Sequence, residues 1–325
     1  GSGGQLLASE ITFEGGEGAG DLMAFRMQKL LQYGHNFFRM GEPMYDYLQP
    51  VDDGLAMRPS GRWAEEKLDY LKRYIDVFET SMREKWERRN YIDVLSGSGK
   101  NQVRDSGKVL LGSPLLALTT RYPFTGYYFV DIEPDNIAAL ETRVAVSELR
   151  SQVKTYTGDC NLLVDGIVAD LMKEGRNSLN LAFLDPEGLE LQWRTVMQLA
   201  SIRRMDLIIN YPRGGLSRTI PLYLNVEDET PIDKFFGGRE WRDVVREHPA
   251  RIQHRQLLDI YKGKLSSLGY QEIKNSGELG EEPLMRNEKQ APLYHLIFAS
   301  KNALGHKFWN QITKRDVHGK RRLFD

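Results

Sequence analysis

Acidic residues follow four apolar runs of the chain, and each run has the length of a buried β-strand. In an open α/β sheet, ligands bind at the carboxyl ends of the strands. Any one acid at such a junction could be a helix cap, but four in succession favour one shared site. The four strand ends carry Asp93 with Ser96, Asp131 with Glu133, Asp159 with Cys160, and Asp185 with Pro186.

The first strand end runs into a glycine turn, within the stretch YIDVLSGSGKN that starts at Tyr91. A triphosphate-binding loop would need glycine at Val94 and Ser or Thr at Asn101. The dinucleotide fingerprint would need a third glycine at Gln102. What remains is a ligand without a pyrophosphate, such as S-adenosylmethionine (SAM), with its sulfonium and amino-acid tail. Glycine–serine loops are also often simple turns.

The amino-acid tail of SAM would lie at the first strand end. Ser96, Gly97 and Gly99 form a turn that lets the backbone approach a ligand closely. Asp93 can accept hydrogen bonds from the ligand's ammonium or balance its charge. These four residues are the predicted contacts to the methionine half of the cofactor.

The nucleoside half would lie at the second and third strand ends. A carboxylate at Asp131 can bind both ribose hydroxyls, with Glu133 as the alternative. Asp159 can accept from the adenine amine, and the backbone N–H of Cys160 would face a ring nitrogen. The Cys160 thiol itself is expected to be a small buried hydrophobic group.

The elements that position these residues alternate between strand and helix. Five strands separated by helices, with nearly continuous apolar runs, predict a parallel sheet buried on both faces. Right-handed crossovers make this a doubly wound, mostly parallel α/β fold. Strands are predicted over 91–95, 126–133, 152–159, 179–188 and 205–212, and helices over 134–150, 163–175 and 192–204.

The flanking regions have a different character. Residues 1–60 are predicted to be an N-terminal extension with a tag remnant, a short helix over 19–38 and a turn-rich connector. Residues 61–325 form the main domain, which opens with a long helix over 63–90. After the fifth strand, about 213–250 is an irregular lid or substrate insertion. A helix over 251–269, strands over 270–275 and 292–301, and a helix over 301–312 complete the chain.

Composition limits the classes of function. The net charge is −1, so no global basic field attracts nucleic acid. The single cysteine excludes a disulfide framework and a cysteine-based zinc cage. No apolar run is long enough to span a membrane, and we expect a cytoplasmic protein without membrane contact. The histidines show no ligand spacing, so no metal is predicted.

The succession YIDVLSGSG, YYFVDIE, TGDCN and AFLDPEG resembles class I SAM-dependent methyltransferases. More closely, the chain resembles the three-Cys-motif partner protein (TcmP) family, through GRWAEEKLDYLKRYIDVF, GSPLLAL, GDCN, LDPEGLELQW and PLYHLIFASKNALGHKFWNQI. This likeness spans about 61–312. It implies a methyltransferase-like fold and a partner protein that carries a three-cysteine motif, and it leaves reaction and substrate open.

The fourth and fifth strand ends suggest the methyl acceptor. Amino-methyltransferases of adenine or cytosine carry Asn/Asp-Pro-Pro-aromatic at the fourth strand; here Asp185 and Pro186 match, but the second proline and the aromatic are absent. Asn210 and Tyr211 at the fifth strand offer an amide and a ring as a partial substitute. Tyr211 could stack on a base, although an aromatic there is more often part of the core.

Trp63 and Lys67 lie one turn apart on the predicted long helix and share a face. The simpler interpretation is a surface lysine along a tryptophan, but the pair matches the family pattern. With Asp185, Lys67 would suit deprotonation of a hydroxyl, with Lys301 or Lys274 as a second lysine.

Arg213 and Arg218 follow the fifth strand, where a substrate phosphate would lie. Charge runs such as these are also often solvated faces. The sequence therefore predicts a SAM-dependent methyltransferase that acts on a nucleic acid (RNA or DNA) or a nucleotide. The alternative is a catalytically silent SAM- or nucleotide-binding partner subunit of a radical-type modification enzyme.

Overall fold

The computed structural model describes residues 47–173, 177–248, 252–270 and 282–316. The chain divides into two compact units, residues 1–45 and 46–325, and all described residues belong to the second. The predicted helix over 19–38, most of the predicted strand over 270–275, and Lys274 lie outside the described residues.

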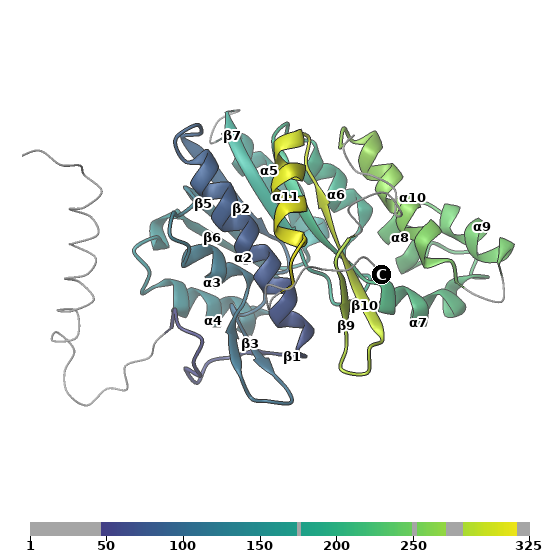
Figure 1. Ribbon diagram of the computed structural model, residues 1–325, viewed down its shortest axis with the longest axis horizontal. Coiled ribbons are helices and arrows are strands. Elements are labelled where there is room, and N and C mark those ends of the chain that lie inside the picture. The colour runs from purple at the N-terminus through teal and green to yellow at the C-terminus, as the bar shows by residue number, and fades with distance from the viewer. Residues whose placement is uncertain (1–46, 174–176, 249–251, 271–281, 317–325) are drawn as a thin grey trace, which may run out of the picture. The chain divides into compact units, whose positions relative to one another are not determined.

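A seven-stranded sheet forms the centre of the described part (Figure 1). Its order is β6-β5-β2-β7-β8-β10-β9, so the first five strands of the sheet run parallel and β10 is antiparallel to both β8 and β9. This order confirms the predicted doubly wound fold of the class I methyltransferase type. The strands are β2 (Arg88–Asp93), β5 (Gly126–Asp131), β6 (Val153–Thr157), β7 (Ser178–Leu184), β8 (Met205–Tyr211), β9 (Leu284–Arg286) and β10 (Pro292–Ala299).

Helices cover both faces of the sheet because side chains alternate along each strand. On β2, Tyr91 packs into one hydrophobic cluster and Ile92 into the other. Helices α2 and α11, which lie together in Figure 1, belong to the first cluster with α3 and α4. Helices α5, α6 and α10 belong to the second. The bounds are α2 (Trp63–Met82), α3 (Ser113–Leu118), α4 (Pro134–Val144), α5 (Cys160–Lys173), α6 (Trp193–Ala200), α10 (His254–Ser267) and α11 (Ala303–Thr313).

A second, three-stranded sheet was not predicted. It has the order β1-β3-β4, with β1 (Arg58–Ser60), β3 (Lys100–Val103) and β4 (Val109–Leu111). The parallel pairing of β1 with β3 places Arg58 opposite Asn101. Residues 47–60, which we call the N-terminal arm, are thereby joined to the segment that follows the glycine turn.

The insertion after β8 is helical, so the prediction of an irregular segment was wrong. It contains α7 (Arg213–Tyr223), α8 (Pro231–Phe236) and α9 (Glu240–Glu247), at the right in Figure 1. Pro221 inside α7 and the shortness of α8 and α9 obscure the helical period in the sequence. A capping box between Thr230 and Asp233 starts α8.

The long helix predicted over 63–90 also ends earlier, at Met82, and Arg88 already belongs to β2. None of the described helices combines the length and the apolar character that a membrane crossing requires.

Candidate functional site

Four acidic residues lie at the carboxyl ends of four neighbouring strands. Asp93 ends β2, Asp131 ends β5, Asp159 follows β6 and Asp185 follows β7. These strands are adjacent in the order β6-β5-β2-β7. The fold therefore brings the four predicted strand ends to one edge of the sheet.

A cavity of about 320 Å³ opens at this edge. Its lining includes Leu95 after β2, Ile132 after β5, and Gly158 to Asn161 after β6. Ile132 is 61% exposed, which is high for an isoleucine. The cavity thus combines apolar walls with the carboxylate of Asp159, a composition typical of small-molecule sites.

The glycine turn is tied to the second strand end. The backbone N–H of Gly97 donates to Oδ2 of Asp131 at 2.8 Å. Gly97 and Gly99 have φ values of 61° and 90°, a region that favours glycine. A Cβ on Gly99 would lie 2.9 Å from Leu140, whereas one on Gly97 would meet nothing closer than 4.0 Å. Gly99 therefore permits packing, whereas the space beside Gly97 is bounded only by the Arg58 side chain.

Asp131 holds the loop after β5 as well as the glycine turn. Its Oδ1 accepts from the backbone N–H of Glu133 at 3.0 Å and from Asn136 at 2.9 Å. The side chain of Glu133 is exposed. Asp131 is half-buried, with the Oδ2 oxygen accepting one hydrogen bond, so the carboxylate is held rigidly and keeps acceptor capacity.

Asp159 orients the start of α5. Its Oδ1 accepts from both the backbone N–H and the side-chain amide of Asn161, each at 2.8 Å. Asn161 Oδ1 in turn accepts from Gln192 N–H and from the Thr195 hydroxyl. The sequence indicated Asn161 only as a neighbour of Asp159. In the structure it joins the third and fourth strand ends.

Cys160 is 3% exposed, and burial raises the pKa of its thiol to about 12. The expectation of a small buried group at this position agrees with that burial. Ser96 is also buried, and its backbone N–H donates to Val130 at 2.8 Å. The Ser96 N–H is thus already occupied, whereas Cys160 lines the cavity at the sheet edge.

Asp93 is fully buried and incompletely paired. Its Oδ1 accepts from Leu95 N–H at 3.3 Å, while Oδ2 has no hydrogen-bond partner among the described residues. Burial raises the pKa of Asp93 to about 7; a hydrogen bond with the Ser113 side chain opposes this, and the charges of Asp185 and Asp131 add to it. A buried, unpaired carboxylate oxygen is costly, so this position favours a cationic ligand group.

Lys67 and Asp185 form a buried ion pair at the end of β7. Lys67 Nζ lies 2.7 and 2.5 Å from the two carboxylate oxygens. Burial lowers the pKa of Lys67, the charge of Asp185 opposes this, and Arg58 adds to it. Asn210 Nδ2 donates to Asp185 Oδ1 at 2.8 Å, and Asn210 Oδ1 is buried without a hydrogen-bond partner in the described structure. The pairing of Lys67 with Asp185, predicted from sequence, is present in space.

Pro186 is buried directly behind this pair, and its carbonyl lies 3.5 Å from Asn210 Nδ2. Two further residues complete the surroundings. Arg58 Nη1 lies 3.9 Å from Asp185 Oδ2, and the Tyr294 ring centroid lies 5.9 Å from Lys67 Nζ. Sequence reasoning missed both, because Arg58 precedes the recognised region and Tyr294 is in a strand that is remote in sequence.

Other predicted site residues lie elsewhere. Tyr211 is fully buried, with its ring 5.5 Å from that of Tyr261 and 5.7 Å from that of Phe235. It is a core residue and does not present a stacking surface, which corrects the alternative of base stacking. Lys301 donates to the carbonyl of Ala200 at 2.5 Å, at the opposite edge of the sheet. It is therefore not the second lysine.

The remaining predicted substrate contacts surround the site at a distance. The Trp63 ring packs over Gly61, and Arg104 lies 5.9 Å from its centroid. Arg213 is half-buried at the start of α7, and Arg218 is exposed further along this helix. Helix α7 packs against β10, the strand that carries Tyr294.

The N-terminal arm is anchored by a buried charge cluster beneath the glycine turn. Lys100 Nζ lies 2.8 Å from Asp53 Oδ2, and Arg143 Nη2 lies 2.7 Å from Asp53 Oδ1. Arg143 also donates to the carbonyl of Ser98 at 2.6 Å. Burial would raise the pKa of Asp53, but the hydrogen bonds from Arg143 and Lys100 outweigh it and lower this pKa to about 2. Lys100 thus serves the arm and is not available for a phosphate.

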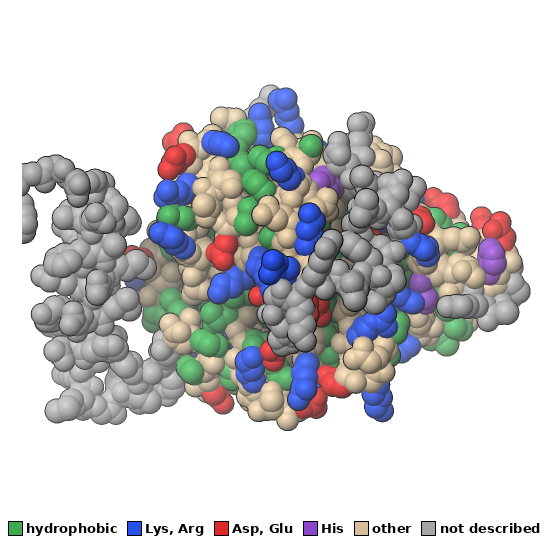
Figure 2. Space-filling view, viewed as in Figure 1, with side chains coloured by type: hydrophobic (Ala, Val, Ile, Leu, Met, Phe, Trp, Pro, Cys, Tyr) green, Lys and Arg blue, Asp and Glu red, His purple; other side chains and the backbone are tan. Residues whose placement is uncertain are grey.

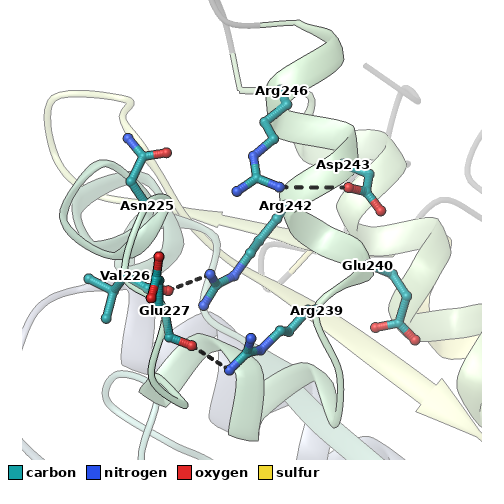
Figure 3. Close-up of a pocket in the computed structure, with 8 residues that line it drawn as sticks. All are labelled: Asn225, Val226, Glu227, Arg239, Glu240, Arg242, Asp243 and Arg246. Carbon is teal, nitrogen blue, oxygen red and sulfur yellow. Dashed lines mark hydrogen bonds and ion pairs between the residues drawn. The ribbon is translucent and has the colours of Figure 1, made fainter.

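A larger hollow of about 780 Å³ lies within the insertion (Figure 3). Arg239 donates to the carbonyl of Glu227 at 2.7 Å, and Arg242 donates to that of Val226. Its three arginines, Arg239, Arg242 and Arg246, are matched by the carboxylates of Glu227, Glu240 and Asp243. The charges in this hollow are balanced, and its residues come from the insertion, not from the strand ends that carry the four acidic residues. We therefore place the candidate site at the sheet edge.

In the described part of the chain, no three or more His, Cys, Asp or Glu side chains are grouped to hold a metal ion. Basic and acidic side chains are interspersed on the face shown in Figure 2.

No family profile and no curated protein matches this chain. Among solved structures it is similar to the O-methyltransferase TomG from Streptomyces achromogenes in complex with SAM, with 10% identity, 68% of this chain and 85% of that chain covered, and a TM-score of 0.34. It is also similar to an O-methyltransferase of a Brevibacillus brevis multienzyme in complex with S-adenosyl-L-homocysteine, with 13% identity, coverages of 75% and 76%, and a TM-score of 0.32. At these identities and TM-scores the likenesses carry no argument about function, which rests on the geometry above.

Proposed function

We propose that this protein is a SAM-dependent methyltransferase. The observation that carries the proposal is Asp93, a fully buried carboxylate with an unpaired oxygen beside an open glycine turn. A ligand with an ammonium group would pair this oxygen. The cavity lined by Ile132 and Asp159, at the neighbouring strand ends, suits a flat aromatic group with an exocyclic amine.

The chain's own residues would divide the cofactor between them. Asp93 and the backbone of Ser96 to Gly99 would hold the amino-acid tail, and Asp131 would accept from the ribose hydroxyls. Asp159, the Cys160 backbone N–H and the exposed Ile132 would surround the adenine. When bound, SAM supplies an electrophilic methyl group on its sulfonium.

Asp185, Lys67 and Asn210 would form the acceptor side. The carboxylate of Asp185 can accept a hydrogen bond from an acceptor hydroxyl or amine, and Lys67 Nζ, 2.5 Å away, holds this carboxylate in place. The unpaired Oδ1 of Asn210 can accept a second hydrogen bond from the acceptor. These groups position the nucleophile, which is the main requirement of methyl transfer.

For the acceptor, we propose a nucleic acid or a nucleotide. The support is that Arg213 and Arg218 both lie on α7, which follows β8 and packs against β10, where cationic side chains could hold a phosphate. The resemblance to the TcmP family adds a partner with a three-cysteine motif to this proposal. Because Tyr211 is buried, the proposal does not include base stacking on the Tyr211 ring.

The test has two steps. Isothermal titration with SAM should give saturable heat that Asp131→Ala abolishes and Asp228→Asn, a change at an exposed loop aspartate, leaves intact. Transfer of tritium from labelled SAM to RNA, DNA and nucleotide mixtures then identifies the acceptor. Absence of binding to the wild-type protein would contradict the proposal.

A silent SAM-binding partner subunit is the second candidate. Its support is that Lys67 already occupies both oxygens of Asp185, and that Tyr211 offers no stacking surface. SAM binding without transfer to any acceptor, with and without the three-cysteine partner, would favour it.

A further inference from the structure

Arg58 is a cation of the N-terminal arm that reaches over the open side of the glycine turn. A Cβ built on Gly97 would lie 4.0 Å from Arg58 Cδ, with nothing nearer. The side chain of Arg58 is 26% exposed. The guanidinium is therefore next to the backbone that the amino-acid tail of SAM would follow, and solvent still reaches it.

The hydrogen-bond partner of this guanidinium is an exposed side chain. Arg58 Nε donates to Glu187 Oε1 at 2.5 Å, and the side chain of Glu187 is 70% exposed. An arginine carries five N–H donors, and the described hydrogen bonds of Arg58 use one. Exposed ion pairs are weak, so a ligand carboxylate can replace Glu187 at small cost.

The other cations near the turn are already committed. Lys67 contacts both oxygens of Asp185, and Lys100 and Arg143 share the buried carboxylate of Asp53. Lys100 and Arg143 are both 0% exposed. Arg58 also lies 3.9 Å from Asp185, but that carboxylate is already held by Lys67, and the hydrogen bond of Arg58 goes to the exposed Glu187.

Two elements fix the position of Arg58. The pairing of β1 with β3 sets it opposite Asn101, two residues after Gly99. The charge cluster of Asp53, Lys100 and Arg143 anchors the arm five residues earlier. The guanidinium is thus presented to the turn by a rigid backbone, which limits the entropy lost on binding.

On the basis of the SAM site proposed above, we infer that Arg58 binds the carboxylate of the cofactor's amino-acid tail. Asp93 and Arg58 then form a matched pair for a zwitterion, one pairing the ammonium and the other the carboxylate. Glu187 occupies Arg58 in the absence of ligand and releases it on binding.

The test compares SAM with decarboxylated SAM, which lacks the carboxylate alone, by isothermal titration. Wild-type protein should bind SAM roughly 10- to 100-fold more tightly, as a charge-assisted pair of hydrogen bonds provides. Arg58→Gln should weaken the binding of SAM but not the binding of decarboxylated SAM, and this removes the preference. Arg58→Lys should keep part of it, because the charge remains without the bidentate fork.

Glu187→Gln should tighten SAM binding about two- to fivefold, as expected when a weak competing ion pair is removed, and leave decarboxylated SAM unchanged. Arg62→Gln, at an exposed arginine four residues further along the chain, is the matched control and should change the binding of neither ligand.

The outcomes separate this inference from the proposed function. Equal affinities of wild-type protein for the two ligands would overturn the role of Arg58, while SAM binding as such would still stand. An unchanged preference in Arg58→Gln would also overturn it. Failure of wild-type protein to bind either ligand would instead reject the cofactor site.

Discussion

Asp93 and Asp185 lie at the ends of neighbouring strands but differ in their partners. Asp185 has Lys67, Asn210 and Arg58 within reach, whereas Asp93 keeps one buried oxygen without a hydrogen bond among the described residues. This difference divides the site: the paired carboxylate suits the acceptor, and the unpaired one suits a cationic ligand. Two predictions test the division.

Lys67→Met should lower methyl transfer about 100-fold or more, the scale of a lost acid–base partner. The affinity for SAM should stay within about twofold, because Lys67 contacts Asp185 and is not a predicted cofactor contact. Single-turnover transfer and isothermal titration measure the two effects. Lys72→Met, at an exposed position of the same helix, is the control. If Lys67→Met, but not Lys72→Met, lost SAM binding, Lys67 would not belong to the acceptor side only.

The affinity for SAM should depend on pH through Asp93. Its pKa of about 7 means that the carboxylate is largely protonated at pH 6 and ionised at pH 8. Binding to the ligand's ammonium should therefore strengthen as pH rises through 7, and weaken above about 8, where an α-amino group loses its proton. Titrations from pH 5.5 to 9 measure this profile. Asp93→Asn should remove the rising limb; a flat wild-type profile would show that Asp93 does not face the ligand.

At this scale, sequence reasoning succeeded for residues at the ends of predicted strands. Asp93, Asp131, Asp159 and Asp185 could be placed because parallel strands carry their carboxyl ends to one edge. Helical spacing placed Trp63 and Lys67 on one face, and a joint role of Lys67 with Asp185 was proposed from the chemistry of the two side chains. Arg58 and Tyr294 could not, because their positions depend on pairings of β1 with β3 and β10 with β8 that no local pattern specifies.

Among the elements, the N-terminal arm links the beginning of the described chain to the ligand-binding turn. Asp53 is 3% exposed and shares its carboxylate between Lys100 and Arg143, both fully buried. Removing one partner from a buried charge cluster leaves uncompensated charge. The arm therefore supports the glycine turn as well as Arg58.

Asp53→Asn should lower the free energy of unfolding by roughly 3–5 kcal/mol, the usual cost of breaking a buried ion pair. It should also weaken SAM binding, because the charge cluster supports the glycine turn. Urea unfolding measures the first effect and titration at low temperature the second. Asp52→Asn, at the exposed neighbouring residue, should have little effect. Equal stability of the two variants would argue against the cluster.

The insertion illustrates why short elements escape prediction. Helices α8 and α9 have six and eight residues, too few for a clear helical period. They are specified by contacts of Asp233, which caps α8 and pairs with Arg242 at 2.7 Å in the next helix. The long strands and α5, with strong apolar periodicity, could be predicted from local sequence.

For the whole molecule, the charge distribution limits how a polyanion could bind. The net charge is −1, and opposite charges are interspersed on the face in Figure 2. A nucleic-acid acceptor would therefore rely on few contacts, with Arg213 and Arg218 as the proposed pair.

Binding of single-stranded RNA or DNA oligomers should accordingly depend weakly on salt. Two phosphate contacts predict a slope of about −1.4 for log affinity against log salt concentration, and Arg218→Gln should reduce it by about 0.7. Fluorescence anisotropy from 50 to 300 mM salt measures it. A slope steeper than about −4 would reveal a larger basic surface.

The charge cluster at Asp53 also decides where this chain can be shortened. A protein that starts at residue 61, directly after β1, would retain Lys100 and Arg143 but lose the carboxylate that both share. Trimming there would thus leave two buried cations without their carboxylate and remove Arg58. Inactivity of such a fragment would reflect a damaged fold, and it could easily be mistaken for evidence that the protein has no activity.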